Sequence, residues 1–348
     1  GRLGALGWPG SSAAAVSRET TPPAPSRLRT AADLAGSPER NDLDQAATHD
    51  ASTPLADSIA DELRVRARHA VAAPLPRPPR TRVMVVANQK GGVGKTTTTV
   101  NMAAALATNG LRVLVVDLDP QGNASTALAV DHQRGTPSSY DALVDGVPLA
   151  DIVRPSPEVE GLFVVPATID LAGAEIELVS LVAREGRLRK ALHAYPPVLS
   201  EDDDRFDYVL IDCPPSLGLL TLNALVAGEE MLIPIQAEYY ALEGLGQLVE
   251  TVEMVREHLN PGLVISSILL TMYDSRTRLS AGVADEVRTH FGDQVLATAI
   301  PRSVRISEAP SYGQSVIAYD PTSAGALSYL EAAREMAGRA GGPEGARQ

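Results

Sequence analysis

The sequence has 348 residues, 44% of them hydrophobic, and a formal net charge of −13 at pH 7. This length predicts one large folded domain plus a tail, because domains usually span about 100–200 residues. The acidic balance argues against a surface that is basic all round, and the single cysteine excludes disulfides within the chain and all-cysteine metal sites.

Residues 1–80 are rich in Ala, Pro, Ser and Arg and end in the proline cluster PLPRPPR. They show no sustained apolar periodicity, which predicts a disordered N-terminal tail, although residues 57–70 have the composition of a short helix. The first residues lack the apolar centre of a secretion signal, and no run approaches the roughly 20 apolar residues of a spanning helix. We therefore expect a cytoplasmic protein with no membrane partner.

Residues 81–337 alternate short β-branched runs with helical stretches. Continuous apolar runs predict strands buried on both faces, so we expect a doubly wound α/β fold with a mostly parallel sheet and helices on both faces. Residues 338–348, which are rich in glycine, are expected to be a flexible end. The predicted strands are VMVVAN, RVLVVDLD, LFVVPA, DYVLIDCPP, EMLIPIQ, LVISSILLT and QVLATAIP, and helices are expected at 97–109, 241–259, 279–291 and 323–337.

The first predicted strand, VMVVAN, runs directly into QKGGVGKTTTT and then into a helix. This strand–loop–helix context is typical of a phosphate-binding loop. Gly91, Gly92 and Gly94 permit conformations in which backbone N–H groups face phosphate oxygens, and the helix N-terminus adds its dipole. Lys95 is expected to neutralise the β- and γ-phosphates of ATP, and Thr96 to offer its hydroxyl to Mg²⁺.

Acidic side chains follow two further predicted strands. RVLVVDLDPQGN places Asp117 and Asp119 at a strand end, and DYVLIDCPPS leads to Asp212 in the pattern of a Walker B strand, whose carboxylate holds Mg²⁺ directly or through water. The simpler alternative for Asp117 and Asp119 is that they end a strand and cap the next helix. Cys213 fits a small buried hydrophobe better than a functional thiol.

The loop departs from the consensus GxxxxGK[ST], because Gln89 stands where the first glycine belongs. Instead, KGGVGKT carries Lys90 five residues before Lys95, which resembles the deviant Walker A class of ATPases. Within that class, residues 82–330 resemble the ParA/Soj family of chromosome- and plasmid-partitioning ATPases. The strings that carry this resemblance are VDLDPQGNAS, DCPPSLGLLTLNAL, EYYALEGLGQL, LLTMYDSRTRLS and AIPRSVRISEAPSYGQSV.

The resemblance implies a Mg²⁺-dependent ATPase that forms a homodimer on ATP. Lys90 would reach the partner subunit's nucleotide, as an arginine finger does, and Asp119 would position or activate the attacking water. Asp117 would support the metal shell and the loop. The implied ATP-binding residues are Lys90, Gly91, Gly92, Val93, Gly94, Lys95, Thr96, Thr97 and, for adenine, Pro301.

The family also binds DNA without sequence preference in its ATP state, which implies an association with the nucleoid. The matching arginines here are Arg276, Arg302 and Arg305, each of which has the alternative of being a solvated charge or part of an ion pair. Few arginines suffice, because a dimer doubles each cation. The resemblance further implies a ParB-type partner, which stimulates hydrolysis and thereby releases the dimer.

Other members of the class fit less well. The nitrogenase iron protein needs cluster cysteines, and a MinD-like protein needs a C-terminal amphipathic membrane helix, whereas this sequence ends in GRAGGPEGARQ. Residues 1–80 show no helix pair of the kind with which large plasmid-type ParA proteins read an operator. Two alternatives stay open: an orphan ParA-like ATPase that positions another cargo, and a metabolic ligase that uses the same loop.

Overall fold

The computed structural model describes residues 74–238 and 241–339, all of which belong to one compact unit, Pro54–Gln348. The expected tail up to residue 73, including the candidate helix at 57–70, and the chain from residue 340 onward lie outside the described residues. Among the helices that the structure describes, none combines the length and apolar character needed to cross a bilayer.

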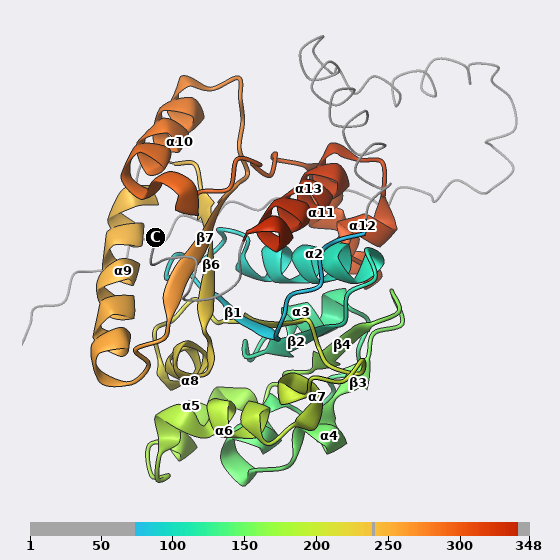
Figure 1. The fold of residues 1–348 in the computed structure, drawn as a ribbon. Helices are drawn as coiled ribbons and strands as arrows, with labels where there is room; N and C mark the ends of the chain where they lie inside the picture. Colours follow the sequence, from blue (N-terminus) through green and yellow to red (C-terminus); the bar gives the residue numbers. More distant parts are fainter. Residues whose placement is uncertain (1–73, 239–240, 340–348) are drawn as a thin grey trace, which may run out of the picture. The chain divides into compact units, whose positions relative to one another are not determined.

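The described residues form a seven-stranded sheet with the order β3-β4-β2-β5-β1-β6-β7 (Figure 1). Every neighbouring pair is parallel except β3 with β4. This arrangement confirms the expected mostly parallel sheet. The strands are β1 (Arg82–Val86), β2 (Val113–Asp117), β3 (Arg154–Pro155), β4 (Leu162–Val165), β5 (Tyr208–Asp212), β6 (Glu230–Gln236) and β7 (Val264–Thr271).

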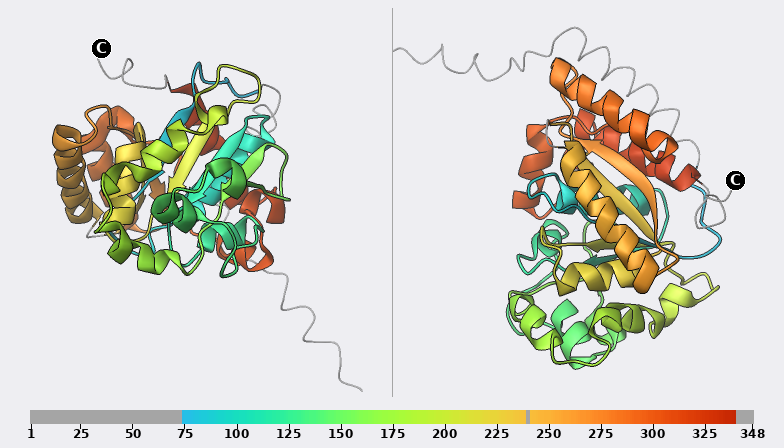
Figure 2. Two further views of the ribbon diagram at one scale, coloured as in Figure 1. Left: turned by 90° about the horizontal axis from the view of Figure 1, so that it is seen from below. Right: turned by 90° about the vertical axis from the view of Figure 1, so that its left-hand side faces the viewer.

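Helices cover both faces of the sheet, and each face buries its own apolar cluster (Figures 1 and 2). One face packs against α2 (Lys95–Thr108), α3 (Asn123–Ala127), α12 (Val316–Tyr319) and α13 (Ala324–Gly338). The other packs against α5 (Leu171–Leu178), α6 (Arg187–His193), α8 (Leu219–Ala227), α9 (Ala241–His258) and α10 (Arg278–Phe291). The shorter helices are α4 (Leu149–Ile152), α7 (Pro196–Leu199) and α11 (Val304–Glu308).

The four helices predicted from sequence are confirmed to within two residues at each end, as α2, α9, α10 and α13. The strand predicted at 294–301 is wrong. That segment makes only two isolated bridges to the edge formed by β7 and the residues after it. The N–H groups of Ala297 and Thr298 donate instead to the carboxylate of Glu335, at 2.7 and 3.1 Å, so no continuous ladder forms.

Residues 74–80, which their proline content placed in the tail, lie against the folded domain. Leu75 is buried, and the guanidinium of Arg77 pairs with Asp207 at 2.7 Å. Arg80 pairs with Glu229 at 2.8 Å. An extended, proline-rich segment can make such side-chain contacts without contributing N–H groups to a sheet.

The strand order brings the acidic strand ends to the phosphate loop. β5 lies between β2 and β1, and Asp212 is the register partner of Asp117 on one side and of Val86 on the other. Because these three strands are parallel, their carboxyl ends lie at one edge of the sheet, where such folds bind ligands.

Candidate functional site

The loop between β1 and α2 leaves several backbone N–H groups without an acceptor among the described residues. Gly92 and Gly94 have φ angles of 75° and 88°, which are left-handed values that favour glycine. The carbonyl of Lys90 accepts a hydrogen bond from Lys95 Nζ at 3.2 Å, whereas the N–H groups of residues 91–94 donate to no atom among the described residues. With the N-terminus of α2 behind it, the loop is a site for an anion.

The two lysines of the loop have different surroundings. Lys95 is only 7% exposed, and burial lowers its pKa while the nearby charge of Asp212 acts to raise it. Lys90 extends to Glu238, with Nζ 3.0 Å from Oε2, and both side chains are nearly half exposed. The N–H of Lys90 donates to Asn88 Oδ1 at 3.0 Å, which holds its backbone in place. Lys95 therefore belongs to the interior of the loop, and Lys90 to its mouth.

Asp212 is buried beneath the loop, at the end of β5. Its Oδ1 accepts a hydrogen bond from the Thr99 hydroxyl at 3.0 Å, whereas its Oδ2 is buried without a partner among the described residues. Burial, and then the neighbouring charge of Asp117, raise the pKa of Asp212, and the hydroxyls of Thr96 and Thr99 act to lower it. A buried carboxylate oxygen without a partner is costly, so this position suits a bound cation.

Asp117 and Asp119 differ in how many of their oxygens are occupied. Asp117 accepts from the N–H of Asp119 at 3.1 Å and from both the N–H and the hydroxyl of Ser125, at 2.9 and 2.7 Å. Asp119 accepts from the N–H of Gln121 through Oδ1 at 3.0 Å, and its Oδ2 bonds to no described residue. Asp117 thus fixes the turn after β2, while Asp119 keeps an oxygen available.

Comparison with known proteins decides the family. A family model described as an AAA domain, AAA_31, matches residues 81–265. The chain is 53% identical over 256 residues to the sporulation initiation inhibitor protein Soj of Bacillus subtilis, which covers 74% of this chain and 98% of Soj. The chromosome partitioning protein ParA of Myxococcus xanthus is 51% identical, over 73% of this chain and 87% of ParA. The chain belongs to the ParA/Soj family of partitioning ATPases.

Solved structures with the same fold contain bound nucleotide and magnesium. A cobyrinic acid a,c-diamide synthase from Mycobacterium smegmatis with bound ADP and magnesium is 41% identical, with a TM-score of 0.60 over 72% of this chain and 91% of that protein. The septum site-determining protein MinD of Pyrococcus horikoshii, with Mg-ADP, is 26% identical, with a TM-score of 0.57 over 73% and 94%. This ParA/Soj-family chain is an ATPase whose cofactors are ATP and Mg²⁺.

The side chains present in this family member fit a Mg²⁺ ion. The hydroxyl of Thr96 and the unpartnered Oδ2 of Asp212 offer two hard oxygen ligands at the base of the loop. No group of three or more His, Cys, Asp or Glu among the described residues could cage a metal by itself. That suits Mg²⁺, which takes one or two carboxylates together with phosphate oxygens and water.

The three arginines expected to bind DNA lie on two segments that meet beyond the end of β7. A bridge between Tyr273 and Pro301 joins these segments. Arg276 is paired with Asp274, with Nε 2.9 Å from Oδ1, and this contact lowers the pKa of Asp274 to about 2. Arg305 contacts two carboxylates at 3.3 and 3.5 Å. The side chain of Arg302 makes no hydrogen bond or close ion pair among the described residues, but its charge also acts to lower the pKa of Asp274.

A hollow of about 250 Å³ opens beside the first turn of α2, next to the loop. Pro301, the expected adenine contact, lies apart from this lining, in the bridge to Tyr273. The hollow is lined by Thr96, Thr97, Val100, Asn101, Asn123, Thr126, Ala127, Pro310 and Gln314.

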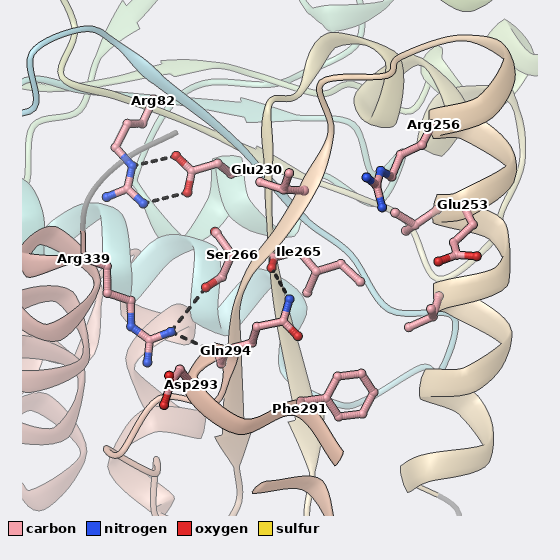
Figure 3. Close-up of a pocket in the computed structure, with 13 residues that line it drawn as sticks. Arg82, Glu230, Glu253, Arg256, Ile265, Ser266, Phe291, Asp293, Gln294 and Arg339 are labelled. Carbon is pink, nitrogen blue, oxygen red and sulfur yellow. Dashed lines mark hydrogen bonds and ion pairs between the residues drawn. The ribbon is translucent and has the colours of Figure 1, made fainter. Parts of the chain in front are cut away.

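A larger hollow, of about 690 Å³, lies at the opposite edge of the sheet, where β1, β6 and β7 begin (Figure 3). Arg82 and Glu230 form a buried ion pair there at 2.6 Å. Arg339 donates to the carbonyl of Ser266 at 3.3 Å. Because this hollow is at the amino ends of the strands, it is separate from the nucleotide site.

Among the residues that shape the site and that sequence reasoning missed are Asn88, Thr99, Ser125 and Glu238. Of these, only Glu238 carries a signal, because it is a charged residue that follows the apolar strand EMLIPIQ almost directly. The others are small polar residues whose roles depend on which strand end lies opposite them.

Proposed function

We propose that this chain is a ParA-type switch for partitioning a chromosome or plasmid. It dimerises on ATP, binds nucleoid DNA in the cytoplasm without sequence preference, and is released when a ParB-type partner stimulates hydrolysis. The observation that carries the proposal is the separation of the two loop lysines, with Lys95 inside the loop and Lys90 in a half-exposed ion pair at its mouth.

Lys90 can leave Glu238 at small cost. An exposed ion pair stabilises a protein by only about 0.2–1 kcal/mol, and the triphosphate of a second subunit offers far more negative charge. Because Asn88 holds the backbone of Lys90, only the side chain has to move. A cation supplied in this way stabilises the charge that develops on the transferred phosphoryl group, so hydrolysis depends on the dimer.

Within one subunit, each remaining residue has a separate task. Thr96 and Asp212 hold Mg²⁺, which when bound neutralises charge on the phosphates. Asp119 uses its available oxygen to orient the attacking water, and Asp117 fixes the turn that carries Asp119. The phosphates are bound by Lys95, Thr97 and the N–H groups of Gly91, Gly92, Val93 and Gly94.

An exposed apolar segment supports the dimer. Ile169 and Leu217 follow β4 and β5, at the sheet edge that carries the loop, and both are more than a third exposed. Ile176 on α5 and Val182 beyond it are 79% and 90% exposed. A second copy, which the proposed role of Lys90 requires, would cover exposed aliphatic side chains of this kind.

The arginines beyond β7 support DNA binding that is local and sensitive to salt, since binding without sequence preference needs only phosphate neutralisation. Arg302 interacts with Asp274 only at longer range, whereas Arg276 and Arg305 would exchange close carboxylate partners for phosphates. Binding to sonicated DNA should appear only with ATP and should weaken steeply as salt rises. Absence of ATP-dependent binding at low salt would remove DNA from the proposal.

Two other functions remain to be separated from partitioning. An orphan ATPase that positions another cargo would have no adjacent gene for a ParB-type protein. The name of the M. smegmatis relative suggests ATP-dependent amide synthesis as the second alternative function. ATP hydrolysis that required an added organic acid would favour synthesis.

The experiment that tests the proposal is size-exclusion chromatography of Asp119→Ala with and without ATP. This variant should bind ATP, stop hydrolysis and accumulate as a dimer that DNA retains. The wild-type protein with ADP is the control and should remain monomeric. A variant that hydrolyses ATP normally, or that stays monomeric at saturating ATP, is incompatible with the proposed switch.

A further inference from the structure

Thr271, the last residue of β7, is joined to the phosphate loop from the far side of the sequence. Its hydroxyl donates to the carbonyl of Val93 at 2.8 Å, and the side chain is 2% exposed. Its methyl group faces Gly94, since a Cβ built at that glycine would lie 3.9 Å from it. The sequence motifs of the loop give no indication of this contact, because 178 positions separate the two bonded residues.

This bond sets the direction of one peptide group. The carbonyl of Val93 and the N–H of Gly94 belong to the same planar trans peptide, so they point in opposite directions. Thr271 holds the carbonyl of Val93 toward the protein interior. The N–H of Gly94 is therefore directed toward the opposite side of the loop, the cradle in which the phosphates would bind. The reversed peptide would place a carbonyl oxygen in the cradle, where it would repel a phosphate.

Gly94 makes such an anchor necessary. It lacks a Cβ and has a φ of 88°, so its own backbone preferences do little to prevent rotation of the peptide that precedes it. Its carbonyl is held separately, by the N–H of Thr98 at 2.8 Å, as the first hydrogen bond of α2. The bond from Thr271 is therefore the one that fixes the peptide between Val93 and Gly94.

We propose that Thr271 is a positioning residue for the nucleotide, whose hydroxyl holds the Val93–Gly94 peptide so that the Gly94 N–H faces the phosphates. It acts on ADP and ATP alike, because both carry the phosphate that the loop binds. We place its role in binding and not in the chemical step, because its buried hydroxyl is committed to the carbonyl of Val93.

The test compares Thr271→Val, which keeps the shape and removes the hydroxyl, with Thr271→Ser, which restores it. Thr81→Val is the matched control, because the Thr81 hydroxyl is also buried and donates to a backbone carbonyl, that of Phe206, at 2.6 Å, at the opposite edge of the sheet. The measurements are KM and kcat for ATP, Mg-ADP affinity by titration, and urea unfolding without nucleotide, all on the full chain.

Thr271→Val should raise KM for ATP and weaken Mg-ADP about threefold to tenfold, the range expected for one net hydrogen bond, with kcat within about twofold. Thr271→Ser should return both to near wild type. Thr81→Val should lower stability as Thr271→Val does, yet leave nucleotide affinity unchanged. Wild-type affinity in Thr271→Val, an equal loss in Thr81→Val, or no rescue by serine would each overturn the proposal.

Discussion

Two lysines five positions apart have different tasks because their surroundings differ. Lys95 is buried and bonded to the loop itself, whereas Lys90 is held outside it by one exposed carboxylate, that of Glu238. The spacing of the motif predicted both residues. In the structure, the two lysines differ because Lys95 is buried and Lys90 pairs with Glu238.

Lys95→Ala should abolish nucleotide binding. Of the two lysines of the loop, Lys95 is the one whose ammonium group is buried in the loop interior, and this variant removes it. Lys90→Ala should keep monomeric nucleotide affinity within about twofold, since its side-chain partner is an exposed ion pair, while preventing the ATP dimer. Titration with a fluorescent nucleotide and size-exclusion chromatography measure the two effects. An equal loss of nucleotide affinity in both variants argues against a role for Lys90 in the partner's site.

Cys213 should resist alkylation in the native protein. It is fully buried, and burial, with the adjacent charge of Asp212, raises its pKa well above the usual value. The thiolate is the reactive form, so the protonated thiol should remain unmodified by iodoacetamide across pH 7–8.5 and react fully in denaturant. Rapid modification of the folded protein would show that the strand end opens to solvent. Its full burial agrees with its interpretation as a core residue.

At the scale of elements, α5 carries a feature that its sequence pattern did not reveal. Its sequence, LAGAEIEL, buries Leu171, Ala174 and Leu178, whereas Ile176 is 79% exposed. If the proposed dimer covers this face, Ile176 would be buried by the second subunit.

Ile176→Asp should weaken the ATP-dependent dimer at least tenfold, because a carboxylate would be buried there in an apolar interface. Met254→Asp on α9 is the control, since Met254 is 60% exposed and should tolerate the charge. Analytical ultracentrifugation of both variants with ATP measures the difference. The same dissociation constant for the two proteins would exclude α5 from the interface.

At the scale of the whole molecule, composition predicted that the folded domain begins at residue 81. In the structure, residues 74–80 already contact the domain. Deleting residues 1–73 should leave the free energy of unfolding and the ATPase rate nearly unchanged. Deleting through residue 80 should cost about 2–4 kcal/mol, because it exposes the site of buried Leu75 and removes the Arg77–Asp207 pair. Chemical denaturation of both truncations checks this, and equal stability would show that residues 74–80 contribute nothing.

Most of the fold was predictable because strands buried on both faces read as continuous apolar runs, and helices between them follow from length and pattern. The strand expected at 294–301 was not predictable in this way. Its apolar residues do lie beside β7, but the ladder is broken by Glu335, a residue that is distant in sequence. The local pattern of apolar residues predicts which residues are buried. It does not predict which acceptor a backbone N–H group will bond to.

The sequence by itself determined the ATPase family, the phosphate loop and the acidic strand ends, because these depend on residue types at fixed local spacing. Only the tertiary structure decided which oxygens of Asp117, Asp119 and Asp212 are occupied, where Lys90 rests, and that Thr271 holds the loop. The physical reason is that hydrogen-bond partners are set by strand order and register, which join residues far apart in the chain.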